Sequence, residues 1–348
     1  MKPRTYLDHN ATAPLRPEAR DAMIAAFDLV GNPSSVHAEG RAARAAVEKA
    51  RAQVATALGA DGADIIFTSG ATEAAALALG GRILHGAGIE HDAVAAWTVE
   101  NLPVDGSGRV RVDTPGTSVL QLANSETGVV QDLPEGLELS DMTQAFGKLP
   151  FAFNWSGCRM GLISAHKLGG PKGVGALVVR RGTDIAPHLK GGGQEMGRRA
   201  GTENVPAIAG FGAAAEAAAR DLADGVWDRV AEFRNILENA IEAAEKETIL
   251  VGKGAQRLPN TSCIATPGWK GETQVMQMDL AGFAISAGSA CSSGKIRASR
   301  VLRAMGYNDD VASGAIRVSL GPQTSEEDVL RFAESWLAKR RKFSARVA

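Results

Sequence analysis

Apolar side chains recur every three or four residues through residues 36–58, with mostly charged side chains between them. A repeat of about 3.6 residues predicts an amphipathic helix, which Gly59 ends. Residues 206–220 and 226–247 predict two more long helices, the first rich in alanine and the second amphipathic. These two helices would connect the halves of the chain.

Four short apolar runs predict buried strands, at residues 64–68, 117–122, 160–163 and 176–179. Small or polar side chains follow the first two runs, at residues 69–73 and 123–128, and Asp141, Thr143 and Gln144 occupy a similar position. Such loops collect ligands where parallel strands end. The pattern therefore predicts an α/β fold with a mainly parallel, doubly wound sheet and a site at one edge.

Beyond Gly252 the pattern changes to short strand-like pieces, at residues 262–266 and 316–320, and a final helix. The sequence Thr-Ser-Glu-Glu at residues 324–327 has the form of a capping box, which would start that helix. These elements predict a smaller α+β domain. We expect a large domain of residues 15–222 and a small domain of residues 1–14 plus 223–348.

Composition and charge narrow the class of protein. The 348 residues are 45% hydrophobic and carry a formal net charge of −1, so no overall positive field attracts nucleic acid. No apolar leader and no membrane-length apolar run is present, so we expect a cytoplasmic protein away from membranes. Cys158, Cys263 and Cys291 are too widely spaced for a zinc knuckle, and neither a metal site nor a disulfide framework is predicted.

Lys167 lies on a turn, residues 164–175, between the last two predicted strands of the large sheet. Its four glycines and one proline let the backbone pass close to a bulky group. The lysine is a candidate for Schiff-base chemistry if its amine is desolvated or flanked by positive charge, because a protonated amine is no nucleophile. A surface hairpin with a solvated lysine explains the turn equally well.

The turn at residues 69–73 leads from a predicted strand directly into an Ala/Leu-rich helix. Free N–H groups and the helix dipole favour an anion such as phosphate at this kind of helix start. A plain capped helix start explains these residues equally well.

Cys291 lies near the middle of residues 285–295, which are mostly small or polar and predict a mobile loop with an exposed thiol. Lys295 and Arg297 would favour the thiolate form, whereas the other two cysteines have more apolar neighbours. Taken alone, a single cytosolic cysteine is more often incidental than catalytic.

Taken together, the motifs resemble those of the cysteine desulfurases, pyridoxal-phosphate enzymes of fold type I in the aminotransferase class V group. The resemblance runs from Tyr6 to Gly321. Its most specific segments are residues 31–35, 68–73, 90–94, 164–175, 191–195, 199–202 and 288–291.

The resemblance implies a role for each matching residue. Lys167 would form the Schiff base with pyridoxal 5′-phosphate and remove the substrate Cα proton, and His91 would stack on the ring and move protons. Asp141 would pair with the ring nitrogen, and Gln144 with the ring hydroxyl. Further cofactor contacts are implied for Ala71, Thr72, Ser164 and His166, and substrate contacts for Arg317, Asn32 and Asn124.

The resemblance also implies partners and a reaction. A threonine matching Thr202 reaches the phosphate of the neighbouring subunit, which implies a homodimer with shared active sites. L-Cysteine would become L-alanine, with a persulfide left on Cys291. The run from Cys291 to Val301 resembles the longer-loop class, which passes sulfur to iron–sulfur scaffold proteins.

Three departures from the family motivate competing hypotheses. Ser125 stands where relatives carry a second asparagine after Asn124, and the segments between Val130 and Asp141 and between Gly80 and His91 are short. A binding protein without catalysis would fit these departures. A selenocysteine lyase or an aminotransferase on the same scaffold is also compatible with the motifs, and neither would require Cys291.

Overall fold

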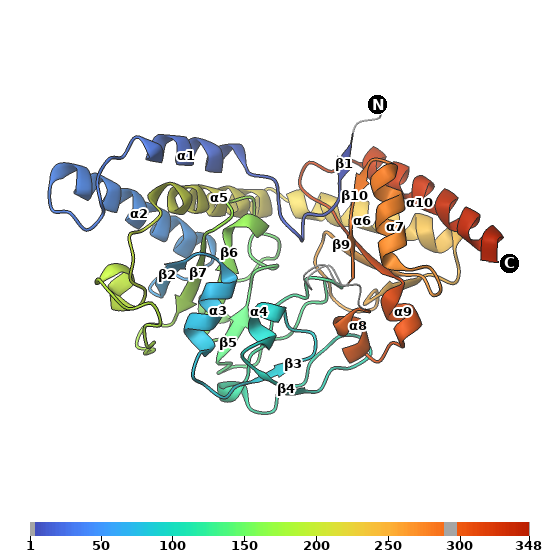
Figure 1. The fold of residues 1–348 in the computed structure, drawn as a ribbon, viewed down its shortest axis with the longest axis horizontal. Coiled ribbons are helices and arrows are strands. Elements are labelled where there is room, and N and C mark those ends of the chain that lie inside the picture. Colours follow the sequence, from blue (N-terminus) through green and yellow to red (C-terminus); the bar gives the residue numbers. More distant parts are fainter. Residues whose placement is uncertain (1–3, 289–297, 348) are drawn as a thin grey trace.

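Two sheets, each packed on both faces, organise the part of the chain that the computed structural model describes, residues 4–288 and 298–347. They lie in two lobes that are side by side (Figure 1). The first lobe contains α1 (Pro17–Phe27), α2 (Ala38–Ala57), β2 (Asp64–Thr68), α3 (Ala71–Leu79), β3 (His85–Ala87), α4 (Asp92–Ala95), β4 (Val99–Leu102), β5 (Leu139–Asp141), β6 (Met160–Ser164), β7 (Gly175–Val179) and α5 (Val205–Ala223).

The second lobe is built mainly from the C-terminal part of the chain. It contains β1 (Thr5–Tyr6), α6 (Val226–Ala244), β8 (Ile249–Val251), β9 (Thr261–Ala265), α7 (Gly271–Leu280), β10 (Phe283–Ala284), β11 (Ser286–Ala287), α8 (Arg300–Ala304), α9 (Asp309–Ser313), β12 (Ala315–Ser319) and α10 (Glu326–Val347). Short 3₁₀ turns occupy Pro115–Thr117, Phe153–Trp155, Ala165–Lys167 and Gln194–Gly197. In the described ranges no helix is both long and apolar enough to cross a membrane.

Alternating side chains of the first sheet fill two different cores. Ile65 and Phe67 of β2 join the core shared with α1, α2 and α5, whereas Ile66 joins the core shared with α3. Successive side chains of a strand point to opposite faces, so helices cover both faces of this sheet. Each such buried side chain contributes roughly 1.5–3 kcal/mol relative to exposure. The predicted doubly wound layering is confirmed.

Strand direction in this sheet is parallel except at β7. The order is β2-β7-β6-β5, with β7 antiparallel to both neighbours and β5 parallel to β6. Parallel bridges from Val119 to Leu139 and from Ser118 to His85 continue the order toward β3 and β4. The mainly parallel sheet is therefore confirmed, and β6 and β7 form the strand–turn–strand unit predicted around Lys167.

The strand predicted at residues 117–122 begins later than expected. Residues 115–117 form a 3₁₀ turn, and the sheet pairing after it consists of single bridges. The N–H groups of Leu120 and Leu122 still donate to the carbonyl oxygens of Leu139 and Asp141, at 3.1 and 2.8 Å. The segment is thus an extended partner of β5 that is too irregular for a continuous ladder.

The second sheet has the order β11-β12-β9-β8 and is antiparallel, and β1 pairs with β10 beside it. The capping box of α10 lies one residue later than predicted. Ser325 Oγ accepts from the N–H of Asp328 at 3.2 Å, and the Asp328 carboxylate accepts from the N–H of Ser325 at 3.1 Å. Thr324 Oγ1 instead accepts from the N–H of Gly321, so it belongs to the preceding turn.

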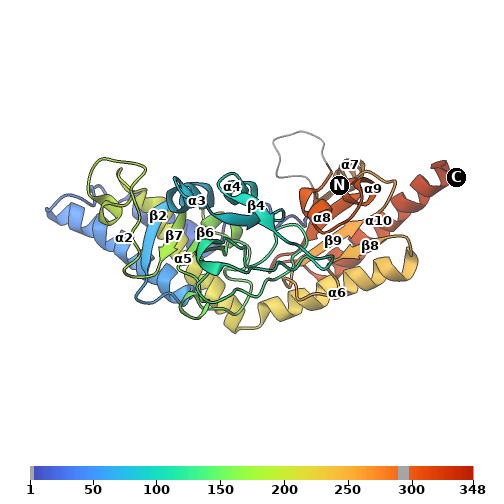
Figure 2. The same ribbon diagram turned by 90° about the horizontal axis from the view of Figure 1, so that it is seen from below.

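Helices α5 and α6 follow one another along one side of both lobes (Figure 2). A left-handed residue, Gly225, with φ of 71°, separates them. Small residues let α5 pack closely, since a Cβ on Gly212 would lie 2.6 Å from Ala50 Cα of α2. The predicted domain boundary at residues 222 and 223 falls at this junction and stays a prediction.

Candidate active site

A cavity of about 560 Å³ opens at the edge of the first sheet. Most of the predicted cofactor residues line this one cavity, although they come from four separate segments. They are Ala71, Thr72, His91, Asp141, Gln144, Ser164, His166 and Lys167. The sequence predicted a site where the strands end, and the structure has a cavity at that place.

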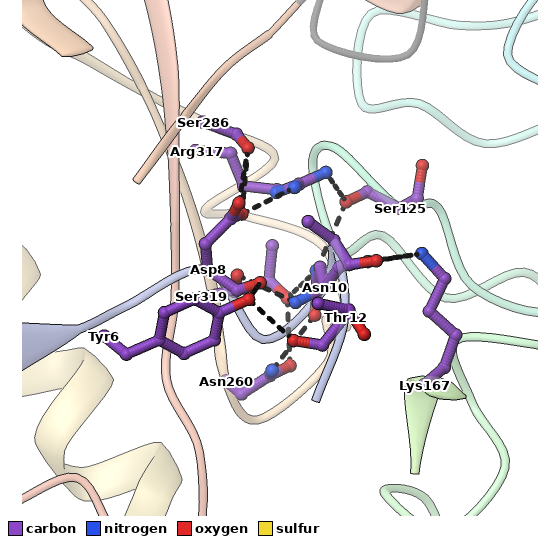
Figure 3. A network of polar contacts seen from close by, with 12 residues as sticks. Tyr6, Asp8, Asn10, Thr12, Ser125, Lys167, Asn260, Ser286, Arg317 and Ser319 are labelled. Atoms are coloured by element: carbon purple, nitrogen blue, oxygen red, sulfur yellow. Dashed lines mark hydrogen bonds and ion pairs between the residues drawn. The ribbon is translucent and has the colours of Figure 1, made fainter. Parts of the chain in front are cut away.

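Lys167 ends the 3₁₀ turn that follows β6, so the hairpin presents its amine to the cavity. Its Nζ donates to the backbone carbonyl oxygens of Asn10 and Ala11, at 2.7 and 2.9 Å (Figure 3). Gly175, on the other strand of the hairpin, packs against the start of α3, because a Cβ there would lie 2.8 Å from Gly70 Cα. Glycine at this position brings the lysine turn and the start of α3 together.

The start of α3 provides a place for an anion. Gly70 occupies the N-cap with φ of 157°, and it has no side chain to satisfy the first N–H groups of the helix. Ala71 and Thr72 follow and line the cavity, so free N–H groups and the positive helix end lie beside it. A phosphate group fits this arrangement.

Asp141 stands at the end of β5 and lines the cavity wall. One carboxylate oxygen accepts from the N–H of Thr143 at 2.9 Å. The hydroxyl of Thr143 is buried and has no hydrogen-bond partner among the described residues, although it belongs to the same wall. A fixed carboxylate beside an unpaired hydroxyl fits a polar, protonated ring nitrogen in this cavity.

Two histidines, His91 and His166, line the cavity. His91 Nδ1 accepts from the N–H of Ala93 at 3.1 Å, so in the neutral ring the proton resides on Nε2. His166 lies 3.2 Å from Thr12 Oγ1. Burial, followed by the positive charges of Lys167 and Lys172, lowers the pKa of His166 to about 4, so this ring is uncharged at neutral pH.

Sequence reasoning missed Asn10 and Lys148. Asn10 supplies the carbonyl that holds Lys167, and this carbonyl also accepts from Gln144 Nε2 at 2.9 Å. Lys148 Nζ donates to Gln144 Oε1 at 2.8 Å from a fully buried position. The contacts of Asn10 with Gln144, Lys148 and Lys167 form only when the N-terminal segment lies against the first sheet, and no local pattern indicates either residue.

Arg317 lies behind the cavity on β12 and is only 4% exposed. Its Nη2 donates to Asp8 at 2.8 Å, and its Nη1 donates to the backbone carbonyl of Ser125 at 3.1 Å (Figure 3). The same Asp8 carboxylate accepts from the hydroxyl of Ser286. Ser125 lines the cavity and accepts the hydrogen bond from Arg317, so Ser125 separates the Arg317 guanidinium from the cavity. Substrate binding by Arg317 stays a prediction.

Three other predicted residues lie outside the cavity wall. Asn124 is buried, and its side chain bonds to the backbone of residues 89, 126 and 127, so its amide holds the loop together. Asn32 is exposed in the loop between α1 and α2. Thr202 lines a separate cavity of about 220 Å³ with Arg199 and Ser69. Within one chain, the structure brings neither Asn32 nor Thr202 to Lys167.

The described cysteines are unsuited to sulfur chemistry. Burial raises the pKa of Cys158 to about 11 and that of Cys263 well above its usual range, which leaves both as thiols at neutral pH. Cys291 lies outside the described residues. In the described part of the chain, His, Cys, Asp and Glu side chains form no group that could hold a metal ion.

Relatives of known sequence identify the family. The sequence profile of the family described as aminotransferase class-V matches residues 5–101 and 107–332. A cysteine desulfurase of Cereibacter sphaeroides is 39% identical over 368 residues, which cover 95% of this chain and 94% of that protein. The cysteine desulfurase IscS of Dictyoglomus turgidum is 37% identical over 366 residues, which cover 94% and 92%.

Solved structures agree with these relatives. The NifS-like protein from Rickettsia africae superposes with a TM-score of 0.87 at 31% identity, covering 97% of this chain and 99% of that one. SspA, solved in complex with cysteine, superposes with a TM-score of 0.76 at 27% identity, covering 92% and 100%. The chain belongs to the aminotransferase class-V family, and the relatives that it matches along nearly its whole length are cysteine desulfurases.

Proposed function

We propose that this chain is a cysteine desulfurase that uses pyridoxal 5′-phosphate. It takes the sulfur of L-cysteine, releases L-alanine and holds the sulfur as a persulfide on Cys291. The observation that carries the proposal is the single cavity that gathers Lys167, Asp141, His91 and the start of α3. Its relatives of similar length support the choice of reaction.

The residues of the cavity fit this cofactor. The first N–H groups of α3 would bind its phosphate, Asp141 would pair with the ring nitrogen, and Lys167 would bond to the aldehyde carbon. When bound, the cofactor supplies an electron sink that stabilises negative charge at the substrate Cα. Lys167 would take the Cα proton, and the Nε2 proton of His91 can be donated into the cavity.

Sulfur transfer to Cys291 balances without a further reactant. The thiolate of Cys291 attacks the sulfur of L-cysteine, the Cβ–S bond breaks, and Cβ gains a proton as alanine forms. The products are L-alanine and a protein persulfide, with no external oxidant or reductant. We further propose a homodimer, in which Thr202 serves the neighbouring site, and an iron–sulfur scaffold protein as sulfur acceptor in the cytoplasm.

The test measures alanine and sulfide formed from L-cysteine by the parent chain and by Cys291→Ala. We expect the variant to lose sulfide release and to keep the yellow colour of the bound cofactor, because Lys167 is untouched. Cys158→Ala is the matched control, and we expect it to keep its activity, because that thiol is buried away from the cavity.

Two results would overturn the proposal. One is full sulfide release by Cys291→Ala, which would favour a lyase that needs no cysteine. The other is a parent protein that stays colourless with added pyridoxal phosphate, which would favour a binding protein. Sedimentation of the purified chain tests the homodimer, and transfer of radioactive sulfur from the loaded enzyme to a scaffold protein tests the acceptor.

A further inference from the structure

Glu73 places a carboxylate in the first turn of α3, next to the N–H groups that would bind a phosphate. The helix is nine residues long, and its N-cap, Gly70, has no side chain. The positive end of a helix attracts any anion, including an acidic side chain of its own first turn. Glu73 directly follows Ala71 and Thr72, which line the main cavity. A carboxylate without a positive partner here would therefore compete with a phosphate and repel it.

Both oxygens of this carboxylate have partners. Glu73 Oε2 accepts from the N–H of Ser69 at 2.8 Å, and Glu73 Oε1 accepts from Arg199 Nε at 2.8 Å. Arg199 Nη2 lies 3.4 Å from Oε2, so the guanidinium meets the carboxylate with two nitrogens. The side chains of Arg199 and Glu73 are 24% and 19% exposed, so water and salt screen this ion pair only in part.

Arg199 approaches Glu73 from beside a different cavity. Arg199 lines the separate cavity of about 220 Å³, and it does not line the main one. Ser69 and Gly173 line both cavities, so these two residues lie between them. The guanidinium therefore holds the Glu73 carboxylate from the far side of the turn that faces the main cavity.

Glu73 is charged in the folded chain. Burial alone would raise its pKa, but the hydrogen bonds that it accepts, first of all from Arg199, outweigh burial and hold the pKa below its usual value. The carboxylate is therefore ionised at neutral pH. Two further carboxylates, those of Glu195 and Glu203, also act on the Arg199 guanidinium. Glu195 has a partner of its own, Arg51, at 2.8 Å.

We propose that Arg199 is a positioning residue for the phosphate site at the start of α3. By pairing with Glu73, it neutralises and restrains the acidic group of the first helical turn, so that this end of the helix stays available to a phosphate. The inference rests on the proposed binding of pyridoxal 5′-phosphate. It concerns the binding of the phosphate group, not the chemistry at Lys167.

The test compares two ligands that differ in the phosphate group, pyridoxal 5′-phosphate and pyridoxal. The full chain, purified without cofactor, is titrated with each, and absorbance follows binding. The ratio of the two dissociation constants reports the contribution of the phosphate, and the hemiacetal that free pyridoxal forms affects every variant alike. In the parent we expect pyridoxal 5′-phosphate to bind at least about tenfold more tightly than pyridoxal.

Two variants separate the charge of Glu73 from the packing of Arg199. We expect Arg199→Met to reduce the preference for the phosphate about tenfold, because Glu73 is left ionised beside it. We expect the double variant Arg199→Met with Glu73→Gln to regain the preference, because a neutral glutamine still accepts from Ser69 and repels no phosphate. Circular dichroism establishes that each variant is folded.

Two controls show whether the effect belongs to this ion pair. Arg198 pairs with Asp64 at 2.6 Å and is 21% exposed, much like Arg199, but Asp64 starts β2 and lies at the other end of that strand from the turn. We expect Arg198→Met to keep the preference of the parent. Combining Arg199→Met with Glu203→Gln removes a different nearby carboxylate, and we expect it not to restore the preference.

The proposal is overturned if folded Arg199→Met keeps the preference of the parent, or if adding Glu73→Gln does not restore it. If Arg199→Met does not fold, Glu73→Gln alone decides. We expect Glu73→Gln to keep or increase the preference, and a decrease overturns the proposal, as does a parent without any preference for the phosphate.

No measurement in this test uses L-cysteine. The inference can therefore fail while the parent still releases sulfide. Equally, the desulfurase reaction can fail while the inference stands, because an enzyme with another reaction could bind the same cofactor. The two failures are thus distinguishable.

Discussion

Asp8 gives the candidate substrate-binding arginine an internal partner. The Asp8 carboxylate accepts from Arg317 and from Ser286, and it is placed by the N-terminal segment. A nearby negative charge orients the guanidinium, and it also cancels part of the positive charge that a substrate carboxylate would meet. By orienting Arg317, Asp8 would strengthen the binding of a substrate carboxylate, whereas its negative charge would weaken that binding.

Substitutions at Asp8 separate these effects. Asp8→Asn keeps a hydrogen-bond acceptor and removes the charge, so we expect the KM for L-cysteine to fall about fivefold, which corresponds to roughly 1 kcal/mol. Asp8→Ala removes both, so we expect KM to rise because Arg317 loses its orientation. Steady-state kinetics and titration with L-alanine measure the two variants. Equal shifts of KM in both variants would contradict this account.

Burial protects the two described cysteines from thiol reagents. Cys158 and Cys263 are buried, and burial raises the pKa of both thiols. We expect iodoacetamide at about pH 7.5 to modify the folded chain at Cys291 alone, since only a thiolate reacts fast, and to modify all three cysteines in urea. Mass spectrometry of tryptic peptides measures this. Modification of Cys158 in the folded chain would refute it.

Recognisable local motifs predicted most of the residues in the cavity wall. The residues that the sequence did not indicate, Asn10 and Lys148, make a long-range contact. Lys167 and Thr72 lie in local patterns, a glycine-rich turn and a strand-to-helix turn. Asn10 and Lys148 lie about 138 positions apart and meet by one hydrogen bond. Nothing in the sequence near either of them signals this meeting, so both were missed.

Helix α5 owes its close packing to glycine. A Cβ on Gly212 would lie 2.6 Å from the backbone Cα of Ala50, whereas a Cβ on Gly210 would lie 2.6 Å from Met23 Cγ and 3.2 Å from the backbone oxygen of Ala19. Alanine is a better helix former than glycine by roughly 1 kcal/mol. Packing therefore decides whether alanine raises or lowers the free energy of unfolding at each position.

Matched substitutions test this difference. We expect Gly212→Ala to lower the free energy of unfolding by about 1–3 kcal/mol, because α2 backbone must move. We expect Gly210→Ala to change it by less than about 1 kcal/mol, because Met23 can turn aside while helix propensity improves. Urea unfolding of both variants measures the change. A larger loss for Gly210→Ala would be inconsistent with the explanation.

At the level of elements, periodicity predicted the long helices and the buried strands well. It failed where one residue decides the outcome. The capping box of α10 uses Ser325 and Asp328, since both lie at the true helix start, whereas the predicted box began at Thr324. The reversed direction of β7 also has no signature in its apolar run, because a buried strand reads alike in either direction.

Two buried carboxyl groups make the stability of the whole molecule depend on pH. Burial raises the pKa of Glu90 to about 8 and that of Glu126 to about 7. One oxygen of each has no hydrogen-bond partner among the described residues. Because the folded chain binds these protons more tightly than the unfolded chain, their contribution is complete below about pH 4.5 and is lost as pH rises through 7 and 8.

Glu90→Gln removes one of these groups while keeping its shape. Between pH 5 and 8 we expect the free energy of unfolding of the parent to fall more steeply with pH than that of Glu90→Gln. The difference in slope is up to about 1.4 kcal/mol per pH unit, which one proton produces. Urea unfolding at several pH values measures both slopes. Parallel curves would show that Glu90 is ionised in the folded chain.

The strand that opens the chain has a consequence for its synthesis. β1 pairs with β10, and the N–H of His9 donates to the carbonyl of Ser319, so the carbonyls that hold Lys167 are positioned by residues near the other terminus. Asp8 and Arg317 are 309 positions apart, an interval that a ribosome takes about 15–60 s to translate. These contacts of the N-terminal segment therefore form only after residues 317–319 have been synthesised. A product that ends before β10 and β12 would contain both Lys167 and Asn10 but would lack the strands that place the N-terminal segment.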